Sequence, residues 1–315
     1  MSEILKKVVL TDLEGFPEVE GKPLAGVDLH SYYDIPNDET FIQRCNGASI
    51  IAWAWFHLTR EVIDRCSALE MVCYLGVGAG SRIDLQYAKS RGIMICNTPH
   101  YGDLAVAEHA ITLTMASARK LVQADRAMRQ GKWEYFVGME LRGATMGIVG
   151  LGSVGAVLAA IGNGLGMNVI SHTKHPSPGR ARENRVRFVG LDELMSTSDF
   201  VQLALALNDE TRRIIGEREL GLMRKDAYLI NVARSGLIDA DALLRVLKEG
   251  RIAGYATDVF EEEPVKKDPL LELDNVISSP HIAFDTPGAK RKMLEIGIDN
   301  VKAYLQGRPQ NIYEA

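Results

Sequence analysis

The fold is decided by the stretch Thr145-Met146-Gly147-Ile148-Val149-Gly150-Leu151-Gly152-Ser153-Val154-Gly155. A short apolar run, residues 145–149, leads directly into glycines with the spacing G-x-G-x-x-G, and an amphipathic helical pattern follows. The order strand, glycine turn, helix is typical of a dinucleotide-binding unit. Glycines at this spacing also occur in turns that bind nothing, so the order of the elements carries the prediction.

Each glycine has a physical reason to be there. Gly150 permits a tight turn, Gly152 lets the backbone approach a pyrophosphate, and Gly155 lets the helix pack closely on the strand. The helix that begins there offers unpaired N–H groups and the positive end of its dipole to phosphates. We therefore expect cofactor contacts from Gly150, Leu151, Gly152, Ser153, Val154 and Gly155.

Short apolar runs alternate with amphipathic stretches on both sides of this segment, which is typical of βα units on a parallel sheet. The predicted fold is α/β, with two doubly wound parallel-sheet domains. Strands are expected at residues 8–10, 24–29, 49–53, 71–75, 93–96, 145–149, 168–171, 201–207, 228–232, 254–259 and 276–279.

A long helical pattern at residues 104–130 separates the two groups of strands, with Asp103 as its N-cap and Gly131 as its stop. The chain is expected to cross between domains before this helix and again after His281. A final amphipathic stretch, residues 288–306, then returns to the first domain. The prediction is a nucleotide domain at 103–285, inserted into a substrate domain formed by 1–102 and 286–315.

Composition excludes several classes of function. The 315 residues carry a net charge of −5, which provides no basic face for nucleic acid. No run of about 18 apolar residues could span a membrane. The first ten residues are too polar for a signal peptide. These observations predict a cytoplasmic protein that binds neither membrane nor nucleic acid.

The cysteines show no metal-binding pattern. Cys45, Cys66, Cys73 and Cys96 form no C-x-x-C pair and have no histidine at zinc spacing. They are interpreted as small buried hydrophobic residues in a reducing compartment. No metal site is predicted.

Three polar segments follow three successive predicted strands, and each contributes one reactive side chain. They are Asn231 to Gly236, Asp258 to Pro264, and Ser279 to His281, which supply Arg234, Glu263 and His281. Ligands in open α/β sheets bind outside the carboxyl ends of the strands, so these side chains should meet at one edge.

These residue types suit the reduction of a 2-keto acid. Hydride addition leaves negative charge on oxygen, and a histidine can donate the proton. A carboxylate hydrogen-bonded to the imidazole orients it and favours its charged form. A guanidinium fork can hold the substrate carboxylate. Taken singly, Arg234 could be a surface ion-pair residue, Glu263 a solvated loop carboxylate and His281 a turn residue; their joint placement favours the catalytic interpretation.

With these motifs the chain resembles the D-isomer-specific 2-hydroxyacid dehydrogenase family over nearly its whole length. The matching segments include Gly76-Val77-Gly78, Val106-Ala107-Glu108-His109, Gly147 to Gly152, Asn231 to Gly236, Asp258 to Pro264 and Pro280-His281. The resemblance implies that Arg234 binds substrate and that Glu263 pairs with the acid/base His281. It also implies a Rossmann nucleotide domain inserted into a flavodoxin-like substrate domain, and a homodimer joined through the nucleotide domains and residues 104–130.

The resemblance assigns further contacts by position. The backbone amides around Gly76, Val77 and Gly78 would hold the substrate carboxylate. The nicotinamide would lie near Val106, Val232, Ala233 and Asp258, and the adenine near Leu205 and Ala206. The loop after the third strand would reach the substrate, with Ala54, Trp53, Trp55 and Phe56 as candidates to line the pocket. Core packing is the alternative for the three aromatic residues.

The cofactor prediction rests on a departure from the family pattern. NAD enzymes of this fold place an acid about 20 residues after the glycine loop, where it binds the ribose 2′-hydroxyl. Here Thr173 takes that place and Lys174 follows, with Arg180 and Arg182 in the same loop. We expect NADP(H) to be preferred over NAD(H). The alternative is a solvated loop that tolerates both.

The predicted activity is oxidoreduction of a small 2-keto or 2-hydroxy acid, of the glyoxylate or hydroxypyruvate type. One alternative is a catalytically weak nucleotide-sensing protein resembling the corepressors of this family. Another is a methyltransferase that uses the glycine loop for S-adenosylmethionine. The presence of all three residues, Arg234, Glu263 and His281, favours the enzyme over the sensing protein, and the set has no role in a methyltransferase.

Overall fold

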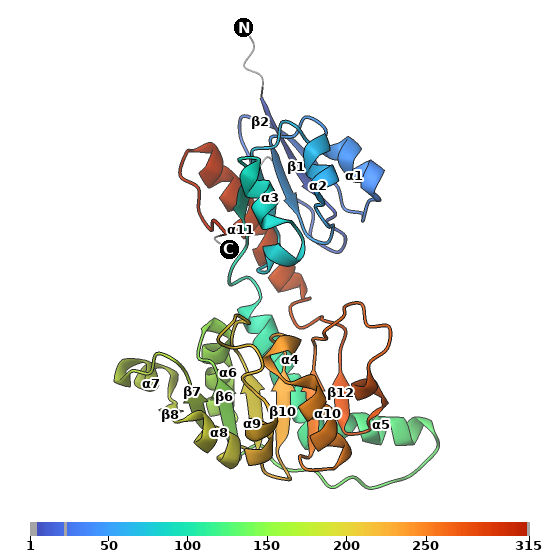
Figure 1. Ribbon diagram of the computed structural model, residues 1–315, viewed down its shortest axis with the longest axis vertical. Helices are drawn as coiled ribbons and strands as arrows, with labels where there is room; N and C mark the ends of the chain where they lie inside the picture. Colours follow the sequence, from blue (N-terminus) through green and yellow to red (C-terminus); the bar gives the residue numbers. More distant parts are fainter. Residues whose placement is uncertain (1–4, 22–23, 314–315) are drawn as a thin grey trace. The chain divides into compact units, whose positions relative to one another are not determined.

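The computed structural model describes residues 5–21 and 24–313, so the first four residues of the polar N-terminus lie outside the described part. The chain divides into two compact units (Figure 1). Unit 1 comprises Met1–Gly102 and Asp285–Ala315, and unit 2 is Asp103–Phe284. The crossings thus fall at Gly102–Asp103 and Phe284–Asp285, the second one residue earlier than the sequence indicates.

Unit 1 is built on a five-stranded parallel sheet with the order β2-β1-β3-β4-β5. This order is that of flavodoxin-like sheets, as predicted. Its strands are β1 Lys6–Thr11, β2 Val27–Ser31, β3 Ile50–Trp53, β4 Met71–Tyr74 and β5 Met94–Cys96. Its helices are α1 Asp38–Cys45, α2 Arg60–Arg65, α3 Leu85–Ser90 and α11 Pro287–Leu305, with a 3₁₀ turn η1 at Ala79–Ser81.

The segment that returns to unit 1 completes its sheet. Beyond α11, Ile312 forms an antiparallel bridge with Cys96 of β5, and the Tyr313 N–H donates to the Ile95 carbonyl at 2.8 Å. The buried Asn300 of α11 donates to the Asn97 carbonyl at 2.8 Å. These contacts pair the backbone of the edge strand β5, which would otherwise be open on one side.

Unit 2 carries a seven-stranded parallel sheet with the order β12-β11-β10-β9-β6-β7-β8, a Rossmann arrangement with one added strand. The strands are β6 Thr145–Val149, β7 Asn168–His172, β8 Arg187–Phe188, β9 Phe200–Leu203, β10 Tyr228–Asn231, β11 Gly254–Thr257 and β12 Val276–Ser278. The helices and 3₁₀ turns are α4 Asp103–Ala118, α5 Leu121–Arg129, α6 Ser153–Gly164, α7 Pro178–Asn184, α8 Leu191–Thr197, α9 Glu217–Leu222, η2 Ser235–Leu237, α10 Ala240–Lys248 and η3 Pro269–Glu272.

The central strands of unit 2 are covered on both faces. All four residues of β9 are buried, and so are all four of β11. Two separate hydrophobic clusters cover the sheet, one around Leu203 and Leu229 and the other around Met146 and Leu158. This burial explains why the strands appear in the sequence as apolar runs without polar alternation.

Several predicted boundaries are wrong. The single helix expected at 104–130 is two helices, because Lys120 adopts a left-handed conformation with φ 48° between them. Asp103 is the first residue of α4 rather than its N-cap. The strand expected at 201–207 ends at Leu203. The two-residue strand β8 was not predicted, since two residues show no periodicity.

Among the described helices, none is both long enough and apolar enough to cross a bilayer. A search of the same residues finds no group of three or more His, Cys, Asp or Glu side chains arranged to hold a metal ion.

Candidate active site

The glycine loop lies between β6 and α6. Gly150 has φ 96°, and a Cβ there would lie 2.6 Å from the Ala204 carbonyl oxygen, so only glycine fits. A Cβ on Gly152 would meet nothing within 4 Å, which leaves its backbone open on one side. At Gly155 a Cβ would collide with the Gly150 carbonyl, so glycine is required for close packing. Each glycine thus has the surroundings that a dinucleotide-binding turn requires.

The first turn of α6 provides the matching donors. The N–H groups of Ser153, Val154 and Gly155 come before the helical hydrogen bonds begin, and no side chain caps this end. Leu151 is buried, so its side chain packs in the core while its backbone remains in the loop. An anion at this helix end would gain from both the N–H groups and the helix dipole.

In the loop after β7, Arg180 and not Lys174 contacts the glycine loop, which differs from the prediction. Lys174 forms an exposed ion pair with Glu210 at 2.7 Å. Thr173 is half-buried, and its Oγ1 accepts from the His175 N–H at 3.5 Å. Arg180, in the first turn of α7, donates to the carbonyl oxygen of Leu151 in the glycine loop. Arg180 is therefore the cation of this loop that contacts the glycine turn.

The turn after β9 closes this side of the sheet. Leu205 packs against one hydrophobic cluster of unit 2. The carbonyl of Ala206 accepts a hydrogen bond from the Thr211 hydroxyl at 2.7 Å. The side chain of Asn208 accepts from the N–H groups of Glu210 and Thr211, each at 3.0 Å. Asn208 therefore stabilises the turn itself.

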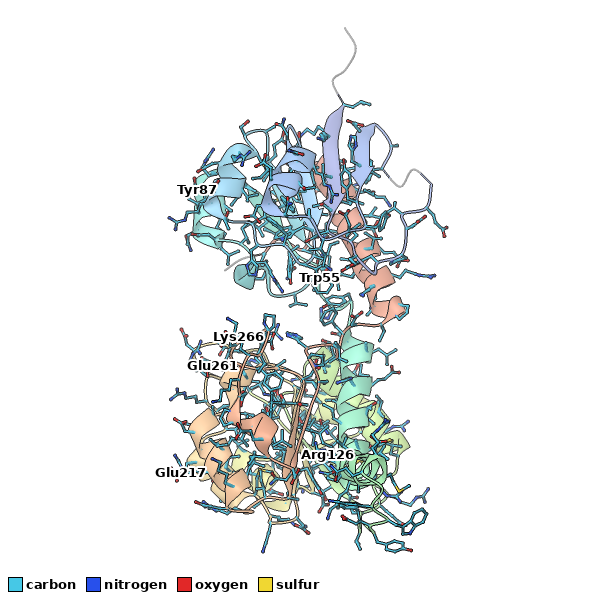
Figure 2. All side chains as sticks on the ribbon, turned by 90° about the vertical axis from the view of Figure 1, so that its right-hand side faces the viewer. Trp55, Tyr87, Arg126, Glu217, Glu261 and Lys266 are labelled. Atoms are coloured by element: carbon cyan, nitrogen blue, oxygen red, sulfur yellow. The ribbon has the colours of Figure 1, made fainter. Side chains whose placement is uncertain are left out.

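Arg234, Glu263 and His281 follow three neighbouring strands. β10, β11 and β12 are adjacent and parallel, so their carboxyl ends lie at one edge of the sheet (Figure 1). The loop after β11, from which Glu261 and Lys266 project, lies at this end of unit 2 (Figure 2). The sequence places the three side chains at this edge, and the strand order brings their loops together.

Glu263 and His281 are hydrogen-bonded to each other. Oε2 of Glu263 lies 2.6 Å from Nδ1 of His281, and Oε1 accepts from the Phe260 N–H at 2.9 Å. About a third of each side chain is exposed, 37% for His281 and 34% for Glu263. The carboxylate thus occupies Nδ1, which leaves Nε2 as the imidazole nitrogen available to a ligand.

The buried carboxylate of Asp258 holds the His281 loop. Its oxygens accept from the Ser279 hydroxyl at 2.5 Å, the Ile282 N–H at 3.0 Å and the Ala283 N–H at 2.7 Å. His109 of α4 lies 2.8 Å from the Ser279 hydroxyl. Asp258 was expected beside the nicotinamide. In the structure its carboxylate makes hydrogen bonds on both sides of His281, a role that the sequence did not suggest.

Asn231 shapes the turn that carries Arg234. Its fully buried side chain accepts from the Ala233 N–H at 3.0 Å and donates to the Arg234 carbonyl at 2.9 Å. Arg234 is exposed, and its Nη1 donates to the Ala233 carbonyl at 2.6 Å. Val232 is buried and Ala233 is half-buried. On α4, Val106 is half-buried against the same hydrophobic cluster as Val232.

In unit 1 the loop after β3 is held by an aspartate that the sequence did not single out. Asp12 follows β1 and is fully buried. Its carboxylate accepts from the N–H groups of Ala54 at 2.7 Å, Trp55 at 2.8 Å and Phe56 at 2.6 Å. Burial raises the pKa of Asp12 even though these three hydrogen bonds lower it. The available signal was an acid directly after a strand, at the carboxyl edge of the sheet.

The aromatic residues near this loop have different positions. Trp53 is fully buried, and its indole N–H donates to the Phe56 carbonyl at 3.0 Å. Phe56 stacks on Phe41 with ring centroids 4.0 Å apart. Trp55 is half-buried and projects from the lower end of unit 1 in Figure 2. Trp53 and Phe56 therefore belong to the core, which leaves Trp55 as the candidate to line a pocket.

The segment Gly76-Val77-Gly78 follows β4. A Cβ on Gly76 would lie 2.5 Å from the ring of Tyr74, so a side chain does not fit there. The Gly76 carbonyl accepts from the Thr98 N–H at 2.9 Å, and the Val77 carbonyl accepts from the Asn97 side chain at 2.9 Å. Val77 itself is 48% exposed. Residues 97 and 98 therefore hold the backbone of this turn by hydrogen bonds, while Val77 remains accessible to solvent.

Comparison with known proteins identifies the family. Residues 111–283 match the model of the D-isomer specific 2-hydroxyacid dehydrogenase NAD binding domain. The chain belongs to this family. It is an NAD(P)-dependent oxidoreductase that transfers hydride between the cofactor and a 2-keto acid, and the alternative of a catalytically weak sensing protein is not favoured.

Relatives and solved structures agree with this assignment. A glyoxylate reductase of Thermococcus gammatolerans is 40% identical over 256 residues, which cover 78% of this chain and 76% of that protein. A D-3-phosphoglycerate dehydrogenase of Methanocaldococcus jannaschii is 39% identical, covering 79% of this chain and 48% of its own length. An acyclic imino acid reductase, solved with NADPH and D-Arg, has a TM-score of 0.81 and 32% identity, covering 98% of this chain and 100% of its own.

The residues present fit a nicotinamide dinucleotide. The left-handed turn at Gly150, the open face at Gly152 and the uncapped start of α6 form a place for a pyrophosphate. At the same edge of the sheet, the Glu263–His281 pair follows β11 and β12. A turn that fits a pyrophosphate and a hydrogen-bonded glutamate–histidine pair therefore share the carboxyl edge of one sheet.

Proposed function

We propose that the chain reduces glyoxylate or hydroxypyruvate to the corresponding 2-hydroxy acid. The carrying observation is the 2.6 Å hydrogen bond between Glu263 and His281, on a loop that Asp258 holds by three hydrogen bonds. The glyoxylate reductase names of the archaeal relatives support this choice of substrate.

In this proposal the bound nicotinamide would supply the hydride. The residues of the chain bind the substrate and donate the proton. His281 donates the proton from Nε2 to the developing alkoxide, while the hydrogen bond from Glu263 at Nδ1 fixes the orientation of the ring. Arg234 leaves its bond to the Ala233 carbonyl and grips the substrate carboxylate through its two-pronged guanidinium. The amides around Gly76, Val77 and Gly78, with Ala54, provide further substrate contacts.

The cofactor contacts follow the same edge of unit 2. The backbone from Gly150 to Gly155 receives the pyrophosphate. Val232, Ala233 and Val106 would contact the nicotinamide, and Leu205 and Ala206 would contact the adenine. Asp258 holds the His281 loop and would also lie beside the nicotinamide.

Steady-state kinetics of His281→Ala test the chemistry. General acid catalysis typically contributes about 10²–10⁴-fold, so kcat should fall by at least about a hundredfold while cofactor binding is retained. The matched control is His30→Ala, which removes a histidine paired with Asp28 at 3.0 Å on β2. A His281→Ala enzyme with more than about a tenth of the normal kcat would contradict the assignment.

We propose further that NADPH is preferred over NADH. Position 173 holds a threonine instead of an acidic residue, so no carboxylate there would repel a 2′-phosphate. Arg180 donates a hydrogen bond to the glycine loop. Lys174 is already paired with Glu210, so Arg180 is the stronger candidate to contact that phosphate. The imino acid reductase solved with NADPH is a neighbour of the same fold.

Values of kcat/KM with each cofactor, at moderate ionic strength, test the preference. Thr173→Asp with Lys174→Ala should reverse it, and Arg180→Gln should weaken NADPH use more than NADH use. A preference of the unmodified enzyme for NADH would overturn this proposal without affecting the proposed reaction. Equal use would favour the tolerant loop.

We propose that the chain forms a homodimer through α4, α5 and the segment that follows. Large apolar side chains are exposed there, including Trp133 at 76% and Tyr135 at 88%. The segment returns to α4 through a bond from the Met139 N–H to the Ala118 carbonyl at 2.9 Å. Exposed apolar surface of this kind marks a protein–protein interface, and the family resemblance favours a second copy of the chain as the partner.

Light scattering after gel filtration tests the dimer. Trp133→Ser with Tyr135→Ser should shift the mass to that of a single chain. The control is Ile35→Ser, which changes an exposed apolar residue of unit 1. A monomeric unmodified protein, or a double variant that remains dimeric, would contradict the interface.

A second substrate class deserves a direct assay because of one structural neighbour. The acyclic imino acid reductase covers nearly the whole chain at 32% identity. Both activities should be assayed. If the chain oxidises D-arginine with NADP⁺ and does not reduce glyoxylate or hydroxypyruvate, its substrate is an imino acid and the keto acid proposal is wrong.

A further inference from the structure

A cavity of about 720 Å³, largely open to solvent, lies at the amino-terminal ends of the unit 2 strands β6 and β7, opposite the glycine loop. Thr145 and Asn168, the first residues of β6 and β7, line it, whereas the glycine loop follows the last residue of β6. The remaining wall comes from α7, β8 and the end of α8. Figure 1 shows α7 and β8 at the outer margin of the sheet. The cavity is therefore separate from the dinucleotide site.

Three arginines are among the residues that line this cavity. Arg182 lies in the last turn of α7, Arg185 follows that helix, and Arg187 begins β8. None of the residues that line the cavity is acidic. The sequence placed Arg182 with Arg180 near the cofactor. The structure separates them, with Arg180 at the glycine loop and Arg182 at the opposite edge.

Two of the three charges are uncompensated. Arg187 donates to Glu193 at 2.6 Å, which offsets its charge. Within residues 5–21 and 24–313, no carboxylate lies within ion-pair distance of Arg182 or Arg185. Arg182 and Arg185 are both exposed and both line the cavity, so an anion bound there would gain from two positive charges that no carboxylate offsets.

The backbone at Arg185 is held in an unfavourable conformation. Its φ is 52° and its ψ 48°, the left-handed region in which glycine or asparagine usually ends a helix. Asn163 of α6 fixes this turn, because its side chain donates to the carbonyls of Asn184 and Arg185, each at 3.2 Å. An arginine at such a position is disfavoured locally, and local strain of this kind concentrates at binding sites.

We propose that this cavity binds a compact phosphate-bearing anion. Arginine forks match the oxygens of phosphate in a two-pronged geometry, and the volume lies in the range of small-molecule sites. An extended nucleic acid fits poorly, because Glu183 and Glu193 stand on the same elements and the chain has a net charge of −5. The ligand is thus a small molecule taken up from solvent, at a site that takes no part in hydride transfer.

Calorimetric titration of the full chain with pyrophosphate tests the site. The protein is first saturated with NADPH, so that the glycine loop is not available to the probe. One pyrophosphate should bind per chain. Arg182→Gln with Arg185→Gln should weaken binding by at least about tenfold, the effect expected for the loss of charge-assisted hydrogen bonds. Arg245→Gln with Arg251→Gln removes the same charge from elsewhere in unit 2 and should leave the affinity within about twofold.

A second variant separates a loss of binding from a loss of folding. Arg185→Gly removes the guanidinium and suits the left-handed backbone, so it should weaken pyrophosphate binding while the melting temperature holds or rises. Citrate, a polycarboxylate without phosphate, should bind more weakly than pyrophosphate. Equal affinity of the unmodified chain and the Arg182/Arg185 double variant for pyrophosphate would overturn the site, and equal affinity for citrate would overturn its phosphate preference. Reductase activity should remain in all of these variants, so failure here leaves the proposed function intact.

Discussion

His281 combines an exposed imidazole with a strained backbone. Its φ is 54°, in the left-handed region that a residue with a Cβ rarely adopts. The hydrogen bonds that the Asp258 carboxylate accepts from Ser279, Ile282 and Ala283 surround this position and hold it. Strain of this kind persists only where neighbouring contacts enforce it, and it is common where a side chain must point in one direction.

Arg234→Lys should be severely impaired although the charge is kept. An ammonium cannot reproduce a two-pronged contact with a carboxylate, and the loss of about 1.5–3 kcal/mol corresponds to a fall of about 10- to 150-fold in kcat/KM for the keto acid. Arg245→Lys on α10 is the matched control. Near-normal efficiency of Arg234→Lys would mean that the substrate carboxylate is held elsewhere.

Asp12→Ala should destabilise unit 1. The change leaves three backbone N–H groups, those of Ala54, Trp55 and Phe56, without their acceptor. Each unsatisfied donor costs about 1–3 kcal/mol, so the free energy of unfolding should fall by at least about 3 kcal/mol. Urea denaturation measures this. A loss below about 1 kcal/mol would show that water replaces the carboxylate.

The raised pKa of Asp12 also predicts a pH dependence. Because burial raises the pKa in the folded state, the folded chain binds the proton more tightly than the unfolded chain. The contribution is fully present below the ordinary Asp pKa of about 3.9 and is lost as the pH rises through the raised value. The stability of the unmodified protein relative to Asp12→Asn should therefore decrease across that window. A difference that stays constant with pH would contradict the shift.

At the scale of elements, the break between α4 and α5 makes a separate prediction. Lys120 has φ 48° and ψ 38°. A left-handed residue with a Cβ costs roughly 1–2 kcal/mol, so Lys120→Gly should raise the free energy of unfolding by about 1 kcal/mol. Ala124→Gly, inside α5, should lower it by about 1 kcal/mol, because glycine is a poor helix former. Destabilisation by both changes would contradict the observed backbone at Lys120.

The elements differ in how far the sequence predicts them. Central strands such as β6 and β9 appear as apolar runs, because both of their faces are buried. The break at Lys120 does not appear, since lysine favours helices and its left-handed turn depends on tertiary contacts. The loops of Glu263 and His281 could be predicted from their order after strands. Asp12 also follows a strand, but its hydrogen-bond partners could not be predicted, because residues 54–56 lie far along the chain and no local pattern links them to it.

At the scale of the whole molecule, the four cysteines are buried thiols of unit 1. Burial raises the pKa of Cys73 to about 12 and that of Cys96 to about 11, and it also raises the pKa of Cys45 and Cys66. A thiol reagent at pH 8 should therefore modify the native protein slowly and all four thiols quickly in guanidinium. Rapid reaction of one native thiol would show that unit 1 opens locally. A cytoplasmic location, which suits free thiols, remains a prediction.

The insertion of unit 2 into unit 1 has a consequence for synthesis on the ribosome. Unit 2 ends at Phe284, whereas unit 1 needs α11 against β4 and residues 311–313 beside β5. The part of the chain translated first therefore finishes folding last. Residues 1–102 must wait with the outer side of β5 unpaired until residues 287–313 leave the exit tunnel. The delay is roughly 10–40 s for the intervening chain at elongation rates of about 5–20 residues per second. During that interval the nascent chain is a client for chaperones that bind open strand edges, although the finished protein presents no such edge at β5.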